Sequence, residues 1–464
     1  MPDYLIKNGT IVSSEKTFDN ELLISNGKIK AIDKEIKASN SSTKIIDAKG
    51  MYIFPGAIDP HVHMSLPSPA GKSSDDFLSG SIAAIAGGTT SLIDFVTPEK
   101  GESYLVALEK RKKEAENCLI DYGFHMSPTW WGESSADEIK KCIKDEGITS
   151  FKTYMAYKNV LGINNEKLIK VMDTVKKYDA LVTIHCENGD LIEYLRNKFI
   201  KEGKISPKYH ILSRPNETEA EAVNRAIIFS KYTKCPIYIV HVSAKESVEI
   251  IQKAQNNKQL VFAETCPHYL LLDDSVFEED NFELAKYVLS PALRKKEDRE
   301  VLWKAIKNGN IQTIGTDHCP FNLKGQKDKG KNDFTKIPNG AGGIEHRLSL
   351  LFTYGVLTNK ISINQFVDIV ATKPAKLFGL HHKKGDIKVG LDADIIIWNP
   401  DKEEIISSKN HFQNCDTNIY EGFKTKGKPE YVIIKGNIAF KNGKIFKENL
   451  KGEYLYRKNN ILSY

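Results

Sequence analysis

The chain has 464 residues, which is too long for one ordinary core, so we expect a large domain and a smaller one. Apolar residues make up 41% of the chain, and the net charge of +6 comes from interleaved lysines and acids without a basic arm, which argues against nucleic-acid binding. No apolar run could span a bilayer and Met-Pro-Asp does not resemble a signal peptide, so we expect no membrane contact.

The first fifty residues are predicted to form short β-strands. The segments DYLIKNGTIV and ELLISNGKIKAID each contain Asn-Gly, which is typical of a hairpin turn. The C-terminal segments DADIIIW and EYVIIKGNIAFKNGKIF have the same character. We therefore expect the two chain ends, residues 1–52 and 386–464, to form one small β domain around a central domain of residues 53–385.

The central region alternates short apolar runs with segments of helical period. The runs are AIDPHVH (57–63), TTSLIDF (89–95), IDYGFHM (120–126), ITSFKTYM (148–155), LVTIHCE (181–187), PIYIVHV (236–242), LVFAETC (260–266) and IQTIGTDH (311–318). Segments 103–117 and 164–178 are predicted helices. This alternation predicts an α/β protein with a parallel sheet, and eight strands favour a (β/α)8 barrel. No GxGxxG follows the first strand, so nucleotide binding has little support.

Six polar side chains lie at the ends of five of these predicted strands. They are His61, His63, Lys152, His185, His241 and Asp317. All lie at carboxyl ends, the face on which barrel enzymes build their sites. Strand side chains alternate with period two, so His61 and His63 point the same way and offer two nitrogens to one ion. Imidazole and carboxylate together suit zinc and related metals.

Lys152 stands in the apolar run ITSFKTYM, where an isolated ammonium group would be costly. Snorkelling to water is one explanation. The ligand count suggests another, because four imidazoles and one carboxylate exceed what one catalytic zinc requires but cannot enclose two metals without a bridge. A neutral lysine amine can add carbon dioxide to give a carbamate, a two-oxygen anion. We therefore predict a carboxylated Lys152 bridging two divalent ions.

With these residues in place, the chain resembles the cyclic amidohydrolases, and within them the dihydropyrimidinase and D-hydantoinase family. The resemblance rests on HVH, FKTYMAYK, IHCENGD, IVHVSA, ETCPHYL, LSPALR, GTDHCPF, PNGAGGIEHR and GLDADIIIW, and it covers nearly the whole chain. It implies a TIM-like barrel beside a composite β-sandwich, a binuclear zinc site with a carboxylated lysine, and a homotetramer. The apolar-aromatic tail EYLYRKNNIL suggests that subunits exchange contacts through their C-terminal ends.

The resemblance also assigns roles to the metal-ligating residues. His61 and His63 fall on the ligands of the first metal, and His185 and His241 on those of the second. Lys152 falls on the bridging carbamate. Asp317 falls on the carboxylate that binds the first metal and transfers the proton, so it is predicted to be catalytic as well as a ligand.

Further residues are expected to contact the substrate. Tyr157 matches a phenol that donates to the scissile carbonyl, and Ser290 and Asn339 match positions that hold the imide or ureide edge. Cys319 is either a substrate contact or a small apolar filler. The substituent on the ring is expected to lie among the gate residues Met64, Leu66, Tyr154 and Leu161.

The implied reaction is hydrolysis of the cyclic amide of dihydrouracil, dihydrothymine or a hydantoin. A hydroxide that bridges the metals would attack the carbonyl and yield an N-carbamoyl amino acid. Allantoinase remains an alternative. Dihydroorotase is disfavoured because HVHMSLP lacks the arginine expected after the histidine pair, and a metal-free homologue of the collapsin response mediator type is disfavoured because every ligand position is filled.

Other conspicuous residues are given structural interpretations. Arg214, Glu217, Glu219 and Arg225 are expected to form a charge network at the start of a helix, and GQKDKGK (325–331) a solvated loop. His318 is expected to face the helices, because it follows Asp317 on its strand. The seven scattered cysteines lack any CxxC pair, which favours reduced thiols and a cytoplasmic location.

Overall fold

The computed structural model describes residues 3–37, 42–158, 160–279 and 281–459. The central part is an eight-stranded parallel sheet in the order β15-β14-β13-β12-β11-β10-β9-β8. Its strands are β8 (Ala57–Asp59), β9 (Thr89–Val96), β10 (Asp121–Met126), β11 (Ser150–Tyr154), β12 (Leu181–His185), β13 (Ile237–Ile239), β14 (Val261–Thr265) and β15 (Thr313–Ile314). All eight predicted strands are present, and the barrel prediction is confirmed.

The barrel is closed where its first and last strands meet. Val62 and His318 form a parallel bridge beyond the ends of β8 and β15. Beneath it, the buried Arg347 donates from Nη1 to the carbonyls of Ile58 and Ile314, at 2.9 Å each. One guanidinium therefore joins the two strands, and it brings the segments that carry His61 and Asp317 together.

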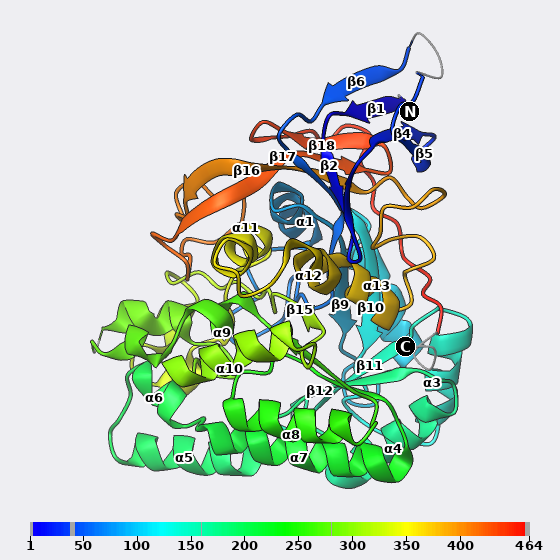
Figure 1. Cartoon of the computed structure of the whole chain (residues 1–464). Helices are drawn as coiled ribbons and strands as arrows, with labels where there is room; N and C mark the ends of the chain where they lie inside the picture. The colour runs from blue at the N-terminus through cyan, green and yellow to red at the C-terminus, as the bar shows by residue number, and fades with distance from the viewer. Residues whose placement is uncertain (1–2, 38–41, 159, 280, 460–464) are drawn as a thin grey trace.

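Helices surround the sheet (Figure 1). The larger ones are α1 (Phe77–Ala86), α2 (Tyr104–Glu114), α3 (Ser135–Lys144), α4 (Asn165–Lys176), α5 (Gly189–Lys201), α7 (Asn216–Thr233), α8 (Lys245–Asn256) and α10 (Lys296–Lys307). The short ones are α6 (Lys208–Leu212), α9 (Pro267–Leu271), α11 (Arg347–Leu351), α12 (Ile363–Val367) and α13 (Lys373–Leu377). Helices α2 and α4 lie where the sequence pattern placed them. The helices around the barrel cover the strands with their apolar faces. They leave the carboxyl ends of the barrel open for a site.

The two chain ends form a second, smaller unit of two sheets. One sheet has the order β5-β4-β1-β6, with β1 (Tyr4–Lys7), β4 (Glu21–Ser25), β5 (Lys28–Asp33) and β6 (Lys44–Asp47). The other has the order β19-β18-β17-β16-β7-β2-β3, with β2 (Thr10–Val12), β3 (Thr17–Asp19), β7 (Tyr52–Pro55), β16 (Ile395–Ile405), β17 (Lys424–Ile434), β18 (Asn437–Lys441) and β19 (Lys444–Ile445). Ile6, Ile24, Ile53 and Ile395 share one apolar cluster between the sheets. This is the expected β-sandwich built from both ends.

One of the two predicted N-terminal hairpins is wrong. Asn26 and Gly27 have φ angles of 50° and 73°, and they connect β4 to β5 in an antiparallel hairpin. Asn8-Gly9 also turns the chain, but β1 and β2 enter different sheets. Each of these strands finds a parallel partner far along the chain, β6 for β1 and β7 for β2. Local turn chemistry predicted the bend correctly but not the pairing.

The C-terminal tail packs against its own barrel. The amide of Tyr122 donates to the carbonyl of Glu453 at 3.0 Å, and the amide of Leu455 donates to the carbonyl of Tyr122 at 2.7 Å. Arg457 is buried and donates to Ser150 Oγ at 2.9 Å. The expectation that this tail reaches a neighbouring subunit therefore has no support from residues 453–458, and residues 460–464 lie outside the described residues.

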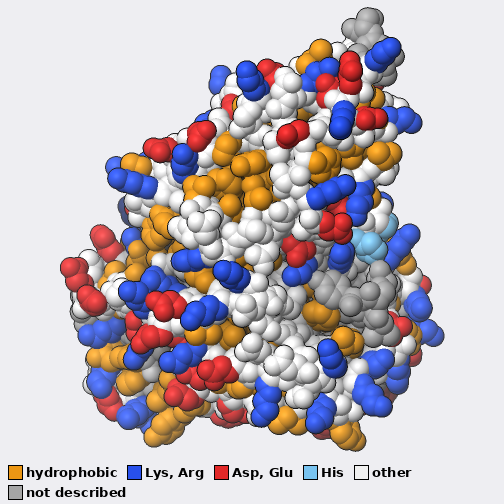
Figure 2. Space-filling model, in the orientation of Figure 1, with side chains coloured by type: hydrophobic (Ala, Val, Ile, Leu, Met, Phe, Trp, Pro, Cys, Tyr) orange, Lys and Arg blue, Asp and Glu red, His pale blue; other side chains and the backbone are white. Residues whose placement is uncertain are grey.

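Several general expectations can be compared with this fold. All seven cysteines are free thiols. On the face in Figure 2, basic and acidic side chains are interleaved without a continuous basic area. Among the described residues, no helix combines the length and apolarity needed to cross a membrane. The division of the chain at residues 52 and 385 stays a prediction.

Candidate metal centre

Three of the predicted ligands meet across the seam of the barrel. His61 and His63 follow β8, and Asp317 follows β15. Asp317 Oδ1 lies 3.2 Å from His61 Nε2 and 3.1 Å from His63 Nε2. The ligand atoms of these three residues all lie within 4.8 Å of one another, so they could hold a metal ion. The structure thus brings together the residues that the strand ends predicted for a first metal.

The second predicted pair lies next to the first. His185 ends β12 and His241 follows β13, and His185 Nδ1 is 2.9 Å from His241 Nε2. The rings of His61 and His241 are 5.5 Å apart between centroids, so the two clusters are neighbours. All four histidines therefore converge on one region inside the carboxyl end of the barrel.

Lys152 projects from β11 into the same region. It is 1% exposed, and its Nζ lies 4.9 Å from the centre of the Phe95 ring and 5.2 Å from that of Tyr154. Within the described part of the chain, no carboxylate oxygen comes within 4 Å of this Nζ. Burial lowers the pKa of Lys152 to about 8. The side chain is therefore not snorkelling to water, and its amine stands among the candidate ligands without a counter-ion.

The hydrogen bonds of His61 show that this donor set fits a cation. Glu264 Oε1 lies 2.7 Å from His61 Nδ1, which makes Nδ1 the protonated nitrogen and leaves the lone pair on Nε2. That lone pair faces the Asp317 carboxylate. Two acceptors at 3.2 Å repel each other unless a proton or a cation lies between them. Among the described residues, His61 Nε2, His63 Nδ1 and His241 Nδ1 have no hydrogen-bond partner.

Two buried glutamates that sequence reasoning missed hold the histidines. Glu264, on β14, accepts from His61 and also from the Tyr238 hydroxyl at 2.8 Å. Glu187 Oε2 lies 2.8 Å from His185 Nε2. A carboxylate bonded to the outer nitrogen of an imidazole fixes the ring and its tautomer. The signal was available in the sequence, because both acids follow or end strongly apolar strands.

The charge network that was expected at the start of a helix also holds residues of the metal centre in place. Arg214 is buried, and its Nη1 lies 2.7 Å from Glu187 Oε2. Although burial alone would raise the pKa of Glu187, the Arg214 guanidinium and the His185 ring hold it below its usual range. Glu219 is also buried and accepts the Ser243 amide at 3.0 Å, two residues after His241. Arg225, by contrast, bonds Asn165 and Glu221 at the surface, as expected.

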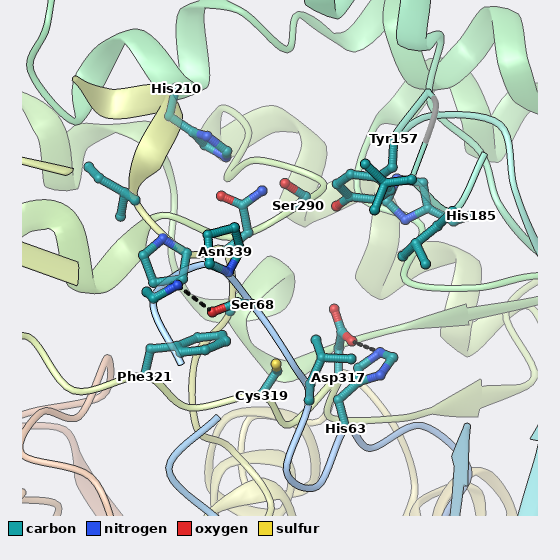
Figure 3. A pocket seen from close by; sticks show the side chains of 18 of the residues that line it. His63, Ser68, Tyr157, His185, His210, Ser290, Asp317, Cys319, Phe321 and Asn339 are labelled. Atoms are coloured by element: carbon teal, nitrogen blue, oxygen red, sulfur yellow. Dashed lines mark hydrogen bonds and ion pairs between the residues drawn. The ribbon is translucent and has the colours of Figure 1, made fainter. Parts of the chain in front are cut away.

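A cavity of about 630 Å³ opens above the metal centre (Figure 3). Its lining includes the predicted substrate residues Tyr157, Ser290, Asn339 and Cys319, together with Leu66, Tyr154 and Leu161 of the gate. Burial raises the pKa of Tyr157, so its phenol stays protonated and able to donate. The predicted substrate and metal residues therefore share one cavity.

Met64 is the gate residue that the structure contradicts. It is fully buried outside the cavity lining, and a Cβ at Gly80 of α1 would lie 2.3 Å from its sulfur. The reason is the alternation that orients His61 and His63 inward, which turns Val62 and Met64 toward the helices. His318 is likewise buried outside the cavity lining. Its Nε2 lies 3.0 Å from Asp75 Oδ2, in agreement with its expected outward direction.

Three of the predicted site residues have strained backbones. Tyr157, His241 and Asp317 have φ angles of 56°, 39° and 50°, in the left-handed region that residues other than glycine rarely adopt. Such strain costs about 1–3 kcal/mol per residue and concentrates at functional sites. It occurs here at the ends of β11, β13 and β15, where the chain must turn a side chain into the cavity.

The fold and the site together define a class of protein. The sequence model of the amidohydrolase family, a metal-dependent family, matches residues 52–439. That range contains the whole barrel and all the candidate ligands. The chain therefore belongs to the amidohydrolase family and, within it, to the group of D-hydantoinases and dihydropyrimidinases, as its relatives indicate.

Those relatives match this chain along nearly its full length. A D-hydantoinase of Geobacillus stearothermophilus is 46% identical over 98% of this chain and 96% of its own. A dihydropyrimidinase of Dictyostelium discoideum is 38% identical over 98% of this chain and 90% of its own. The crystal structure of a dihydropyrimidinase from Brevibacillus agri has a TM-score of 0.97 and 43% identity, covering 98% and 99% of the two chains.

Proposed function

We propose that the protein hydrolyses the ring amide of 5,6-dihydropyrimidines, such as dihydrouracil and dihydrothymine, and of 5-substituted hydantoins. The products are N-carbamoyl amino acids. The observation that carries the proposal is the convergence of four histidines, Asp317 and a buried lysine at the floor of a cavity of about 630 Å³, where the lysine has no carboxylate partner among the described residues. Hydrolases of this group act on cyclic amides, and this donor set suits such chemistry.

The proposed cofactors are two divalent metal ions, Zn²⁺ by preference. His61, His63 and Asp317 would hold one ion, and His185 and His241 the other. A carboxylated Lys152 would hold both ions through its carbamate, because the added carboxylate turns the buried neutral amine into an anion whose charge the two cations would balance. When bound, the metals would polarise the ring carbonyl and lower the pKa of water.

The remaining steps fall to side chains of this chain. Asp317 accepts the proton of the attacking water and returns it to the leaving ring nitrogen. The Tyr157 phenol donates to the carbonyl oxygen as negative charge develops on it. Ser290 and Asn339 hold the imide or ureide edge of the ring. Their position in the cavity lining, on the side of Tyr157, supports this role (Figure 3).

The substrate is tested by a side-by-side assay of dihydrouracil, 5-phenylhydantoin, allantoin and dihydroorotate, with metal content measured on the same samples. We expect turnover of the first two and about two metal ions per chain. Turnover of allantoin alone would assign the protein to allantoin hydrolysis instead. Absence of turnover with all four compounds, with both metals bound, would refute the proposal.

We also propose that the protein is a cytoplasmic homotetramer. The seven free thiols suit a reducing compartment. Large apolar side chains stand exposed on α5, α6 and α7, namely Leu191 at 36%, Tyr194 at 64%, Leu212 at 52% and Ile228 at 54%. A surface of this kind is suited to contact a second copy through a symmetric interface. Sedimentation at micromolar concentration should show four chains per particle, and a monomer would refute the assembly.

A further inference from the structure

The loop expected to be solvated instead inserts a lysine into the protein. Lys327 begins a 3-10 turn, Lys327–Gly330, and is 1% exposed. Its Nζ donates to the carbonyl of Val288 at 3.1 Å and to that of Pro338 at 3.0 Å. No carboxylate in the described part of the chain lies within 4 Å of this Nζ. Lys327 is thus, like Lys152, a buried lysine without a carboxylate partner among the described residues, and its amine is bound by carbonyl groups.

The two carbonyls belong to the two segments that are proposed to hold the substrate. Val288 precedes Ser290 by two residues, and Pro338 directly precedes Asn339. The amide of Gly340 donates to the same Val288 carbonyl at 3.0 Å. Ser290, Pro338, Asn339 and Gly340 all line the cavity. The Nζ of Lys327 therefore lies behind the cavity wall and joins its two segments at fixed distances.

Neighbouring residues of the loop bind a third segment near the cavity. Gln326 Nε2 donates to the carbonyl of Lys72 at 2.7 Å, and Lys329 Nζ donates to that of Ala70 at 3.0 Å. Gly330 passes so close to Ile337 that a Cβ would lie 2.4 Å from its side chain. The turn is thus bonded through its side chains to three backbone segments near the cavity, at residues 70–72, 288 and 338.

The environment of Lys327 makes this placement costly. Val288, Phe334 and Ile337 belong to a separate apolar cluster beside it. Burial lowers the pKa of Lys327 to about 7. An apolar side chain of similar length would avoid the desolvation of an amine, but it would remove the donor to the Pro338 carbonyl and leave the Val288 carbonyl with the Gly340 amide alone. What the lysine contributes, and an apolar residue cannot, is a second connection between the two segments, beside the bond from the Gly340 amide to the Val288 carbonyl.

We propose that Lys327 is a positioning residue that sets the spacing between Ser290 and Asn339, and so the fit of the ureide or imide edge of the substrate. The inference rests on the proposed function. Lys327 touches neither the metal ligands nor Tyr157, whose positions are set by the barrel strands. Its loss should therefore weaken the binding of ground state and transition state alike, which raises KM and leaves kcat nearly unchanged.

The test compares Lys327→Met with Lys331→Met. Methionine has similar length but no donor, and Lys331 is an exposed residue of the same loop outside the cavity lining. With dihydrouracil and 5-phenylhydantoin, Lys327→Met should raise KM about tenfold, as for the loss of about one hydrogen bond to the substrate in ground state and transition state alike, with kcat and metal content unchanged. Lys331→Met should match the parent. Lys327→Arg, which can still donate to both carbonyls, should recover part of the loss.

Two outcomes would overturn the inference. One is an unchanged KM in Lys327→Met. The other is a joint fall of kcat and metal content, whatever the KM, which would indicate a general structural role. If Lys327→Met does not fold, Lys327→Gln provides the same comparison, because its shorter amide cannot reach both carbonyls.

A second measurement does not depend on turnover. Hydrogen–deuterium exchange should increase in peptides covering 286–292 and 336–342 of Lys327→Met, while peptides covering β11 and β12 stay protected. Lys331→Met should show neither change. If the parent hydrolyses no cyclic amide, the proposed function fails, but the exchange data still decide whether Lys327 joins the two segments. Equal exchange in the parent and both variants would overturn the connection itself.

Discussion

Replacing Glu264 by glutamine should weaken metal binding at the His61 site without disturbing the fold. The substitution keeps the length of the side chain and one oxygen acceptor, but it removes the negative charge opposite His61 Nδ1. Tyr238 and Thr313 share a hydrogen bond of 2.5 Å in which either hydroxyl can be the donor, so Tyr238 can turn to accept from the new amide. His61 therefore keeps a bond, but a neutral one.

The magnitude follows from that single bond. A charge-assisted hydrogen bond is roughly twice as strong as a neutral one, so the change at 2.7 Å corresponds to about 1–2 kcal/mol. Loss of such a partner typically lowers metal affinity about ten- to a hundredfold. Titration of the metal-free protein with Zn²⁺, in competition with a chelating dye, should show this loss in one of two binding events. Glu249→Gln, on the exposed face of α8, is the matched control and should bind zinc like the parent. Equal affinities in the two variants would refute the idea that Glu264 holds His61 for the metal.

Lys152→Ala should lose bound metal and nearly all activity, because the bridging anion is gone, and millimolar acetate or propionate should restore part of both; a variant that keeps two metals and near-normal turnover would refute the carbamate. Tyr157→Phe should lower kcat about a hundred- to a thousandfold with metal content unchanged, because one donor to the developing oxyanion is removed. Turnover at the parent rate would exclude that role. Burial raises the pKa of Glu345 from its ordinary 4.5 to about 8, so the folded protein retains a proton that the unfolded chain releases, and stability falls as pH rises between these values. Glu345→Gln should therefore melt like the parent near pH 4.5 and several degrees higher near pH 8, and an equal difference at both pH values would contradict this linkage.

Strands and their polar ends could be predicted from the sequence because both depend on local patterns. Apolar, β-branched runs gave all eight barrel strands, and a residue at the end of a barrel strand faces the site by topology alone. The alternation of side chains along a strand places His61 and His63 in the site. The same alternation should have excluded Met64, because it turns Met64 toward α1. That error came from applying the resemblance without the alternation.

What could not be predicted depends on partners far along the chain. Asn8-Gly9 signals a turn, but only the remainder of the sheet decides that β1 and β2 separate. From the charge pattern, Lys327 is one of several lysines that are expected to be solvated. Nothing in GQKDKGK shows that this side chain donates to the carbonyls of Val288 and Pro338. Glu187 and Glu264 were visible as acids in apolar strands, yet their role required knowing which histidine each one contacts.

Arg347 joins the first and last strands of the barrel, and this junction affects the order in which the protein can fold during synthesis. Arg347 joins Ile58 and Ile314, which lie far apart in the sequence and are therefore synthesised at different times. Arg347 itself is synthesised after both of them. The strands next to them can pair as they emerge, but His61 and Asp317 cannot be held together until about three quarters of the chain has been made. The candidate site of His61, His63 and Asp317 therefore forms only after all eight barrel strands have been made. Until then, the growing chain presents His61 and His63 without a fixed position for Asp317.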